Sequence, residues 1–271
     1  MPDAEPGFGP AAADLDLLVA AAREAGAVAF RHFRHDPAQW TKSGGSPVSE
    51  ADLAADRALA ERLRPARPDY GWLSEETVDG PDRLARRRLF VVDPIDGTRA
   101  FLAGSEFWSV SAAVVEGDRP IAAALHAPAL GLTWTAVAGG GAFRDGAPVA
   151  VAGRDRLAGA RVSAPRRWFD TAAMRAEGFA EERLVPSLAL RLARVADGDL
   201  DLAFASRNAH DWDLAAADLL VQEAGGRLTA ANGDAPRYNR PVPRHPPLAA
   251  AGPGLGDAAM RLLARLEAVP K

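Results

Sequence analysis

The sequence predicts an α/β protein in which sheets and helices form layers, and two patterns carry this prediction. Between residues 108 and 152, short strand-like runs follow one another with turn residues between them, which is typical of antiparallel pairing. From about residue 153 onward, strands and helices alternate, which favours sheets covered by helices. We therefore predict a mobile tail over residues 1–10, an α+β domain over 11–152 and an α/β domain over 153–271, with the boundary near Gly153.

Composition excludes several classes of protein. The chain has 271 residues, 48% of them hydrophobic and 25% charged, which is enough to build large cores. A net charge of −4 and the lack of a long basic run give no indication of a nucleic-acid polymer as partner. The absence of cysteine excludes disulfides, thiolate zinc sites and a cysteine nucleophile. The acidic N-terminus lacks the basic residues of a secretory signal, and no apolar run reaches the ~20 residues of a membrane span, so we expect a cytoplasmic protein without membrane partners.

The first part of the chain predicts two helices. Residues 15–33 are Ala-rich and amphipathic, which indicates a helix, and a loop rich in small residues follows over 41–47. Residues 46–63 indicate a second helix, because Ser49 and Asp52 have capping-box spacing. We expect this helix to end near Pro65 and to bury one face that carries Leu53, Leu59 and Leu63.

The remaining elements follow from apolar runs and the turns between them. Residues 70–76 and 88–94 are expected to be strands that deliver carboxylates from their carboxyl ends. The antiparallel runs cover residues 108–115, 121–128, 132–138 and 143–152. In the second half we expect strands within 156–165, 199–205, 227–231 and 247–252, and helices over 186–198, 212–226 and the C-terminal residues.

Asp93 and Asp96 end the run VVDPIDGTRAF, where a turn explains the proline and the glycine but not both acids. Two carboxylates ~4 Å apart repel by about 4 kcal/mol at an effective dielectric constant of about 20, so a basic side chain, a shifted pKa or a divalent cation must compensate them. An all-oxygen cluster favours a hard cation such as Mg²⁺. Pro94 fixes the backbone between the acids and leaves the Ile95 carbonyl free to point at the same centre.

Gly97 and Thr98 follow the two acids directly. Their backbone N–H groups are expected to bind an anion such as phosphate. A metal cluster beside an anion cradle indicates phosphoester chemistry, and therefore a small-molecule phosphate ester as substrate.

Other acids are candidates to complete such a site. Glu75 and Glu76 end one predicted strand, and Asp211 and Asp213 lie at the start of a predicted helix. Solvated carboxylates are the alternative for the glutamates, and an N-cap or a helix-dipole partner is the alternative for the aspartates. Asp52 has a similar alternative, the capping box with Ser49.

Taken together, four segments resemble the inositol monophosphatase family of Mg²⁺-dependent, lithium-sensitive phosphatases. In chain order they are KSGGSPVSEAD, LSEE, VVDPIDGTRAF and HDWDLAAADLLVQEAGG. The resemblance implies a five-layered αβαβα sandwich, a homodimer, and two or three Mg²⁺ ions in each site. It also implies a phosphomonoesterase in which a metal-activated water attacks phosphorus directly, without a phosphoenzyme.

The resemblance assigns the metal ligands residue by residue. Glu75, Asp93 and the Ile95 carbonyl would hold one ion, and Asp93, Asp96 and Asp213 a second. Glu75 would also contact a third, looser ion.

The same resemblance assigns the groups around the reacting phosphate. Asp52 and Thr98 would orient and deprotonate the attacking water, and with Glu75 they form the expected catalytic set. Gly97 and Thr98 would hold phosphate oxygens, and Lys42 would lie near the catalytic site.

The substrate is expected to be a 3'(2'),5'-bisphosphate nucleotide, 3'-phosphoadenosine 5'-phosphate. The segments LSEE, DGTRAF, WSVS and HAPAL are similar to those of the CysQ-like 3'(2'),5'-bisphosphate nucleotidases, which often carry lysine where Arg99 stands. Ser206 lies seven residues before Asp213, where the inositol enzymes tend to carry a glutamate. Inositol 1-phosphate or another sugar or polyol phosphate is the alternative.

Further substrate contacts are open to two interpretations. A second phosphate could meet the arginines Arg99, Arg166, Arg167 and Arg207, and the alternative for each is a solvated surface position. His210 could contact the leaving group, or it could be a half-buried histidine bonded to the backbone.

Two rival interpretations remain. A phosphatase with an aspartyl nucleophile also follows a strand with paired aspartates, but those are two residues apart, whereas Asp93 and Asp96 are three apart. The other rival is a non-catalytic protein that uses the same fold to bind a partner. A binding role alone places no demand on Asp52 and Thr98 together.

Overall fold

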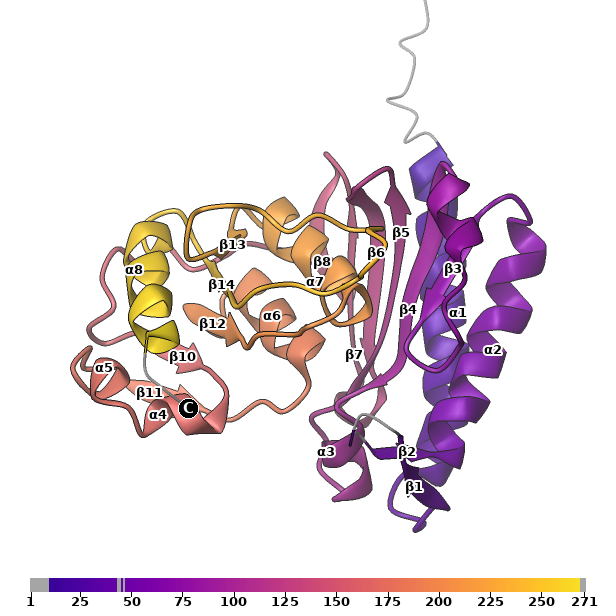
Figure 1. Ribbon diagram of the computed structural model, residues 1–271, viewed down its shortest axis with the longest axis horizontal. Helices are drawn as coiled ribbons and strands as arrows, with labels where there is room; N and C mark the ends of the chain where they lie inside the picture. Colours follow the sequence, from indigo (N-terminus) through magenta and orange to yellow (C-terminus); the bar gives the residue numbers. More distant parts are fainter. Residues whose placement is uncertain (1–9, 43–44, 46, 269–271) are drawn as a thin grey trace, which may run out of the picture.

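Five alternating layers of helices and sheets make up the computed structural model of the chain, which describes residues 10–42, 45 and 47–268 (Figure 1). From right to left in Figure 1 these are a helix pair, a seven-stranded sheet, a second helix pair, a five-stranded sheet and an outer layer of helices. The expected αβαβα sandwich is therefore confirmed.

The larger sheet contains the antiparallel runs expected from the sequence. Its strands, in spatial order, are β3 (Gly71–Ser74), β4 (Arg88–Asp96), β5 (Ser109–Glu116), β6 (Arg119–Ala127), β7 (Leu132–Val137), β8 (Gly141–Arg144) and β9 (Ala147–Val149). β3 runs parallel to β4, and all later pairs are antiparallel. The run expected as one strand over 143–152 is instead split between β8 and β9, because Asp145 and Gly146 adopt positive φ and turn the chain.

Two long helices cover one face of this sheet. They are α1 (Pro10–His32) and α2 (Glu50–Ala66), and α2 follows the short hairpin of β1 (Gln39–Thr41) and β2 (Pro47–Ser49). Leu59 and Leu63 of α2 are buried as expected, whereas Leu53 is 39% exposed, and its predicted place in the core is wrong. Leu53 and Leu59 are six positions apart, which is not a whole number of helical turns, and Ala55 takes the core position instead.

The opposite face of the sheet packs on the middle helices. These are α6 (Leu188–Ala196) and α7 (Asp211–Glu223), and both lie in the same hydrophobic core as the inner side chains of β4, β5 and β6. Ala215, Ala216 and Ala217 of α7 are buried, and such small side chains let a helix lie close to the elements on either side of it.

The smaller sheet closes the other side of the middle helices. Its strands, in spatial order, are β11 (Glu181–Arg183), β10 (Arg161–Ser163), β12 (Leu202–Ala205), β14 (Leu248–Ala251) and β13 (Arg227–Ala230). β10 pairs in parallel with β11 and β12, while β14 is antiparallel to both of its neighbours. The outer layer consists of α8 (Gly256–Glu267) with the short helices α4 (Arg166–Phe169) and α5 (Ala172–Arg175), of which only α8 was expected.

Short elements complete the chain. The 3₁₀ turns η1 (Pro81–Ala85) and η2 (Pro128–Leu130) precede β4 and β7, and α3 (Thr98–Leu102) is a short helix directly after β4. The larger sheet ends at Val149 and the smaller one begins at Arg161, so the predicted domain boundary near Gly153 falls between them and stays a prediction. Nine of the ten residues of the predicted mobile tail lie outside the described residues.

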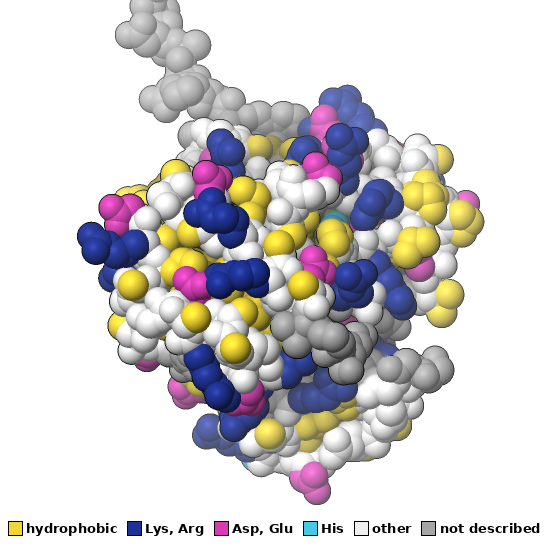
Figure 2. Space-filling model, turned by 60° about the vertical axis from the view of Figure 1, so that its left-hand side comes forward, with side chains coloured by type: hydrophobic (Ala, Val, Ile, Leu, Met, Phe, Trp, Pro, Cys, Tyr) yellow, Lys and Arg dark blue, Asp and Glu magenta, His cyan; other side chains and the backbone are white. Residues whose placement is uncertain are grey.

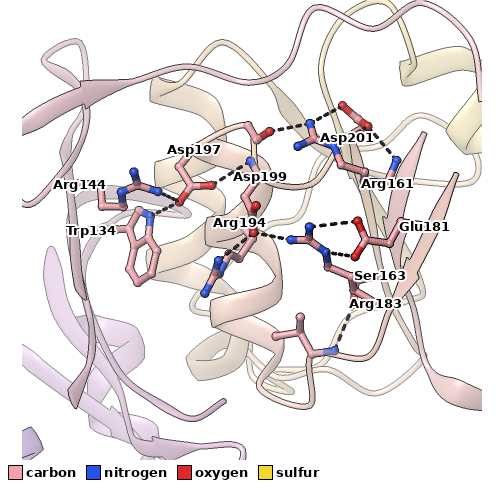
Figure 3. A network of polar contacts seen from close by, with 12 residues as sticks. Trp134, Arg144, Arg161, Ser163, Glu181, Arg183, Arg194, Asp197, Asp199 and Asp201 are labelled. Atoms are coloured by element: carbon pink, nitrogen blue, oxygen red, sulfur yellow. Dashed lines mark hydrogen bonds and ion pairs between the residues drawn. The ribbon is translucent and has the colours of Figure 1, made fainter. Parts of the chain in front are cut away.

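A polar network at the C-terminal end of α6 links the two sheets (Figure 3). Asp197 Oδ2 accepts hydrogen bonds from Trp134 Nε1 on β7 at 3.0 Å and from Arg144 Nη1 on β8 at 2.9 Å. Two residues on, Asp199 Oδ2 accepts from Arg194 on α6 and from Arg183 on β11, each at 2.8 Å. The network therefore fixes α6 to both sheets at the end opposite to the cavity described below. Within the described residues, no helix combines the length and apolar character needed to cross a membrane.

Candidate active site

A cavity of about 520 Å³ lies where β4 and α3 meet the start of α7 and the segment before α6. It is lined by Pro47, Glu75, Asp93, Asp96, Gly97, Thr98, Arg99, Ala100, Arg166, Pro186 and Asp213. Residues from Pro47 to Asp213 meet here, and the predicted acidic segments account for most of them.

A β-bulge explains how Asp93 and Asp96 reach the same cavity. Side chains alternate along a strand, so residues three apart normally point to opposite faces. On β4, Asp93 pairs with Ser111 and Asp96 with Ser109, which leaves one extra residue on β4. Ile95 accordingly packs in the core beneath α1 and α2, although Val91 packs on the other face of the sheet, in the core shared with α6 and α7. Pro94 suits the bulge because it has no N–H group to leave unpaired.

Three carboxylates form the centre of the cavity. Glu75 follows β3, Asp93 lies on β4 and Asp213 lies in the first turn of α7, and one oxygen of each lies within 4.8 Å of the others. Burial, followed by the charges of Glu75, Asp96 and Asp213, raises the pKa of Asp93 well above its ordinary value. Burial and the charge of Asp96 do the same for Asp213. Ionising this cluster therefore requires a compensating positive charge.

The residues present fit a hard divalent cation. Asp93 Oδ2 is buried and has no hydrogen-bond partner in the described part of the protein, which is costly for a carboxylate oxygen unless a ligand meets it. The donors are all carboxylate oxygens, the ligand type of Mg²⁺ and related ions. Glu75, Asp93 and Asp213 would hold the ion, and Asp96, which lines the same cavity, lies outside this group of mutually close oxygens.

Asp96 is held by the N-terminus of α6, a contact that was not expected from the sequence. Its Oδ2 accepts hydrogen bonds from the Ser187 hydroxyl and from the Ala189 N–H at 2.7 Å. Burial raises the pKa of Asp96 to about 6, although these two hydrogen bonds oppose the shift. Ser187 before the apolar run of α6 is a recognisable N-cap, and it accepts from the Leu190 N–H at 3.1 Å. The sequence contains no signal, however, for the partner 91 positions away.

Gly97 is required by the backbone at the junction of β4 and α3. Its φ of +94° lies in the left-handed region, which favours glycine. A side chain here would also meet Ser187 Cβ at 3.1 Å and the Phe107 carbonyl oxygen at 3.2 Å. Gly97 therefore allows α3 to begin in close contact with Ser187, the N-cap of α6.

Thr98 and Asp52 form a hydrogen-bonded pair beside the cavity. The Thr98 hydroxyl lies 3.1 Å from Asp52 Oδ1 and 3.1 Å from the Ile95 carbonyl oxygen, and its single proton can serve one acceptor at a time. Asp52 Oδ2 also accepts from the N–H and hydroxyl of Ser49, so the expected capping box forms as well. Burial raises the pKa of Asp52.

Lys42 lies close to the acidic cluster. Its Nζ donates to Glu75 Oε1 at 3.0 Å and to Glu76 Oε1 at 2.6 Å. Burial raises the pKa of Glu76 to about 7, and the nearby Lys42 opposes this shift. Glu76 is thus engaged by the lysine, while Glu75 serves both the lysine and the carboxylate cluster.

The two acids at the start of α7 have different surroundings. Asp213 belongs to the cavity, whereas Asp211 is buried against His245 and accepts from the Asn239 N–H at 2.8 Å. His210 is half-buried, and its ring stacks on Trp212 with centroids 4.4 Å apart.

The ring of His210 is bonded to a side chain, and it also takes part in the capping box of α7, in which it faces the backbone N–H of Asp213. Its Nε2 accepts from Arg244 Nε at 3.1 Å, and its Nδ1 lies 3.8 Å from Asp213 Oδ2. His210 is not among the residues that line the cavity, so its predicted contact with the leaving group stays a prediction.

Of the four candidate arginines, Arg99 and Arg166 line the cavity. The other two lie elsewhere: Arg167 stacks over the Trp168 ring at 5.7 Å, and Arg207 pairs with Glu267 at 3.0 Å. In the space-filling view, Lys and Arg side chains gather along a hollow in the lower part of the face drawn (Figure 2). Arg99 and Arg166 place positive charge at the rim of an otherwise acidic cavity.

Comparison with known proteins identifies the family. The family model for the inositol monophosphatase family matches residues 13–269. A Streptomyces griseus protein named glucose-1-phosphate thymidylyltransferase is 36% identical, covering 81% of this chain and 86% of that protein. The inositol-1-monophosphatase of Mesorhizobium japonicum is 34% identical, with 81% and 86% covered. The 3'(2'),5'-bisphosphate nucleotidase CysQ of Aggregatibacter actinomycetemcomitans is 31% identical, with 73% and 77% covered.

The solved structures agree with the sequence relatives. The structure of the extragenic suppressor protein suhB from Bartonella henselae superposes with a TM-score of 0.82 at 30% identity, covering 93% of this chain and 98% of that one. The relatives have names of different activities at similar identity, so they leave the substrate open. The fold and the acidic cavity nevertheless agree with the family whose model matches the chain. The chain belongs to the inositol monophosphatase family and is a phosphatase of that family.

Proposed function

We propose that the chain is a Mg²⁺-dependent phosphomonoesterase whose substrate is a 3'(2'),5'-bisphosphate nucleotide, with 3'-phosphoadenosine 5'-phosphate as the best candidate. The observation that carries the proposal is the cluster of Glu75, Asp93 and Asp213 in a cavity that also presents Arg99 and Arg166. The acids supply a cation site for one phosphate, and the arginines supply a site for a second.

The acidic cluster supports metal dependence. Burial and, after it, repulsion by neighbouring carboxylates raise the pKa values of Asp93 and Asp213 well above the ordinary value, and a divalent cation would offset both effects. When bound, Mg²⁺ would supply the positive charge that draws the phosphate in and makes a water molecule acidic. Two or three ions, lithium sensitivity, a homodimer and a cytoplasmic location stay predictions.

Asp52 and Thr98 support a role in orienting and deprotonating the attacking water. The Thr98 hydroxyl lines the cavity and is held by Asp52 Oδ1 behind it. Because burial raises the pKa of Asp52, this carboxylate is a better proton acceptor near neutral pH than an exposed aspartate. Asp96 is held rigidly by Ser187 and Ala189, which leaves its Oδ1 for the cavity.

Arg99 and Arg166 support a substrate with a second anionic group. They reach the cavity from different layers, since Arg99 lies on α3 and Arg166 begins α4. A guanidinium group binds phosphate with paired N–H groups, so two of them at one rim favour a bisphosphate over a monophosphate.

Inositol 1-phosphate is the second candidate. A relative named inositol-1-monophosphatase is 34% identical, slightly above the value for the relative named CysQ. A non-catalytic binding protein is the candidate from another class.

The first experiment measures phosphate release by the purified protein with Mg²⁺ and with a chelator. We expect hydrolysis of 3'-phosphoadenosine 5'-phosphate that exceeds hydrolysis of inositol 1-phosphate and stops when the metal is chelated. Preference for inositol 1-phosphate would overturn the nucleotide assignment and support the second candidate. Activity that survives the chelator, or no activity on either ester, would overturn the metal-dependent phosphatase mechanism.

Three variants separate the roles of the residues. Asp93→Asn should abolish hydrolysis, and unchanged phosphate release would contradict the metal-site assignment. Arg166→Gln should raise KM for 3'-phosphoadenosine 5'-phosphate much more than for 3'-AMP, which lacks the second phosphate. Arg207→Gln is the matched control, because Arg207 pairs with Glu267 away from the cavity and should leave both KM values unchanged.

A further inference from the structure

Residues 231–247, here called the strap, connect β13 to β14 without regular secondary structure (Figure 1). Polar contacts nevertheless fix them on the molecule. The Tyr238 hydroxyl donates to the buried Asp218 of α7 at 2.9 Å, and the Tyr238 N–H donates to the Asp118 carbonyl at 3.2 Å. Arg83 donates to Asn239 Oδ1 at 2.8 Å and to the Arg240 carbonyl at 2.9 Å. A segment held in this way can form the wall of a permanent cavity.

The strap encloses such a cavity. It has a volume of about 370 Å³, and its polar lining comes from Arg119, Asn232, Asp234, Arg237, Arg240 and His245. This volume falls within the range of small-molecule sites, roughly 300 to 1,000 Å³. The cavity shares no lining residue with the candidate active site, so the two are distinct hollows in the described part of the protein.

Positive charge dominates this lining. Three arginines face one carboxylate, Asp234, whose Oδ2 already accepts from Asn232 Nδ2 at 2.7 Å. Arg119 and Arg237 share Asp118 at the long distances of 4.0 and 3.9 Å, and the Arg237 side chain is 70% exposed. Pairs of this kind hold a guanidinium group only weakly. Arg119 and Arg237 are therefore available to an anion, whereas Arg240 Nη2 donates to the Arg244 carbonyl at 2.8 Å. Guanidinium groups suit phosphate.

His245 adds a buried polar group to the same cavity. It is 3% exposed, and its Nε2 lies 2.7 Å from Asp211 Oδ1. Its other ring nitrogen, Nδ1, is buried without a partner among the described residues. With Nε2–H donating to Asp211, Nδ1 is an acceptor, which a ligand hydroxyl or a protonated phosphate oxygen can satisfy.

We propose that the strap cavity is a second ligand site, separate from the active site, for a small anion that carries a phosphate group. The arginines bind the charged oxygens, and His245 accepts from a hydroxyl of the same ligand. The site is also connected to the active site through α7, because Asp211, the partner of His245, precedes Asp213 by two residues on that helix.

The test is calorimetric titration of the full chain with inorganic phosphate in the presence of a chelator, at an ionic strength fixed with chloride. Arg237→Gln removes one positive charge and only a long ion pair to Asp118, and it should weaken binding by roughly tenfold. Arg119→Gln should do the same, although it also removes a hydrogen bond to the Pro236 carbonyl. Circular dichroism would verify that both variants are folded.

The matched control is Arg207→Gln, which removes an arginine that lines neither cavity. We expect this variant to bind phosphate as the unchanged protein does. Failure of the unchanged protein to bind phosphate, equal binding by folded Arg237→Gln, or loss of binding in Arg207→Gln would each overturn the proposal. None of these results depends on hydrolysis, so they are independent of the proposed phosphatase substrate.

Discussion

The Ser187 hydroxyl donates a hydrogen bond to Asp96 and thereby joins the carboxyl end of β4 to the first turn of α6. The same side chain caps α6 by accepting from the Leu190 N–H at 3.1 Å. One residue thus fixes a helix of the middle layer and a carboxylate of the candidate active site. Because the helix end carries partial positive charge, it also favours the ionised form of Asp96.

Ser187→Ala should lower both stability and activity. Loss of the cap and of the bond to a buried carboxylate should reduce the free energy of unfolding by about 1 to 3 kcal/mol. Activity should fall with it, because Asp96 loses a partner that holds it in place. Urea unfolding and phosphate release measure the two effects. Ser187→Thr keeps the hydroxyl and should recover most of the activity, whereas equal loss in both variants would contradict the role of the hydroxyl.

The Thr98 hydroxyl should be needed for catalysis but not for folding. Thr98→Val keeps the shape of the side chain and removes its hydrogen bonds to Asp52 and the Ile95 carbonyl. We expect kcat to fall by about 10² to 10⁴, the usual contribution of positioned proton-transfer groups. Steady-state kinetics of Thr98→Ser provide the control, since serine retains the hydroxyl. Normal kcat in Thr98→Val would exclude Thr98 from the reaction.

Without metal, the protein should lose stability as the pH rises. Burial raises the pKa of Asp96 from 3.8 to about 6, and burial and mutual repulsion also raise the pKa values of Asp93 and Asp213 well above 3.8. Each group binds its proton more tightly in the folded protein, so its stabilising effect is complete below the unfolded pKa and is lost as pH rises through the folded pKa. The expected slope is at most about 1.4 kcal/mol per pH unit for each group.

Denaturant unfolding in a chelator between pH 4.5 and 7 measures this slope. Asp199 and Asp201, whose pKa values are lowered, change stability mainly below this interval. Burial lowers the pKa values of His126 and His210, which act in the opposite direction within it, so the slope is compared between the unchanged protein and Asp93→Asn, which share both histidines. Mg²⁺ should flatten the dependence by compensating the ionised carboxylates, and Asp93→Asn should flatten it without metal. Stability that increases with pH in the chelator would show that the acidic cluster is not repulsive.

Tyr238→Phe should loosen the strap. It removes the hydroxyl that donates to Asp218 and leaves a buried carboxylate without that partner, which should cost about 1 to 3 kcal/mol of unfolding free energy. Thermal unfolding followed by calorimetry measures the loss. Tyr70→Phe removes a less buried hydroxyl that bonds to Asp14 and should cost less. An equal or larger loss of unfolding free energy in Tyr70→Phe would contradict the larger contribution expected from the hydrogen bond to Asp218.

Local patterns were enough to predict much of the fold. The amphipathic period of residues 15–33 gave α1, and the turn residues between apolar runs separated β5, β6 and β7. The short elements α4, α5 and β11 were missed because three or four residues carry too little periodicity. Leu53 was placed on the same face as Leu59 and Leu63, but six positions do not make a whole number of helical turns, and Leu53 is exposed.

The candidate site divides in the same way. Glu75 and Asp93 could be named from their positions at the ends of predicted strands, and Asp213 from its position at the start of a predicted helix. The structure places one oxygen of each close to the others. Ser187 and His245 could not, because their partners Asp96 and Asp211 are 91 and 34 positions away in sequence. Such pairs arise only when the sheets and helices assemble, and no local rule contains them.

The extra residue in β4 has a consequence for how substitutions along this strand will be tolerated. A polar-substitution scan should alternate between the two hydrophobic cores from Leu89 to Val92, because odd and even positions face different helix layers. Beyond Asp93 the alternation restarts one step out of phase, so that Ile95 belongs with Phe90 and Val92. A substitution that let β4 pair regularly with β5 across Pro94, without the bulge, would therefore turn Asp96 away from the cavity, even though every acidic side chain of the site would still be present in the sequence.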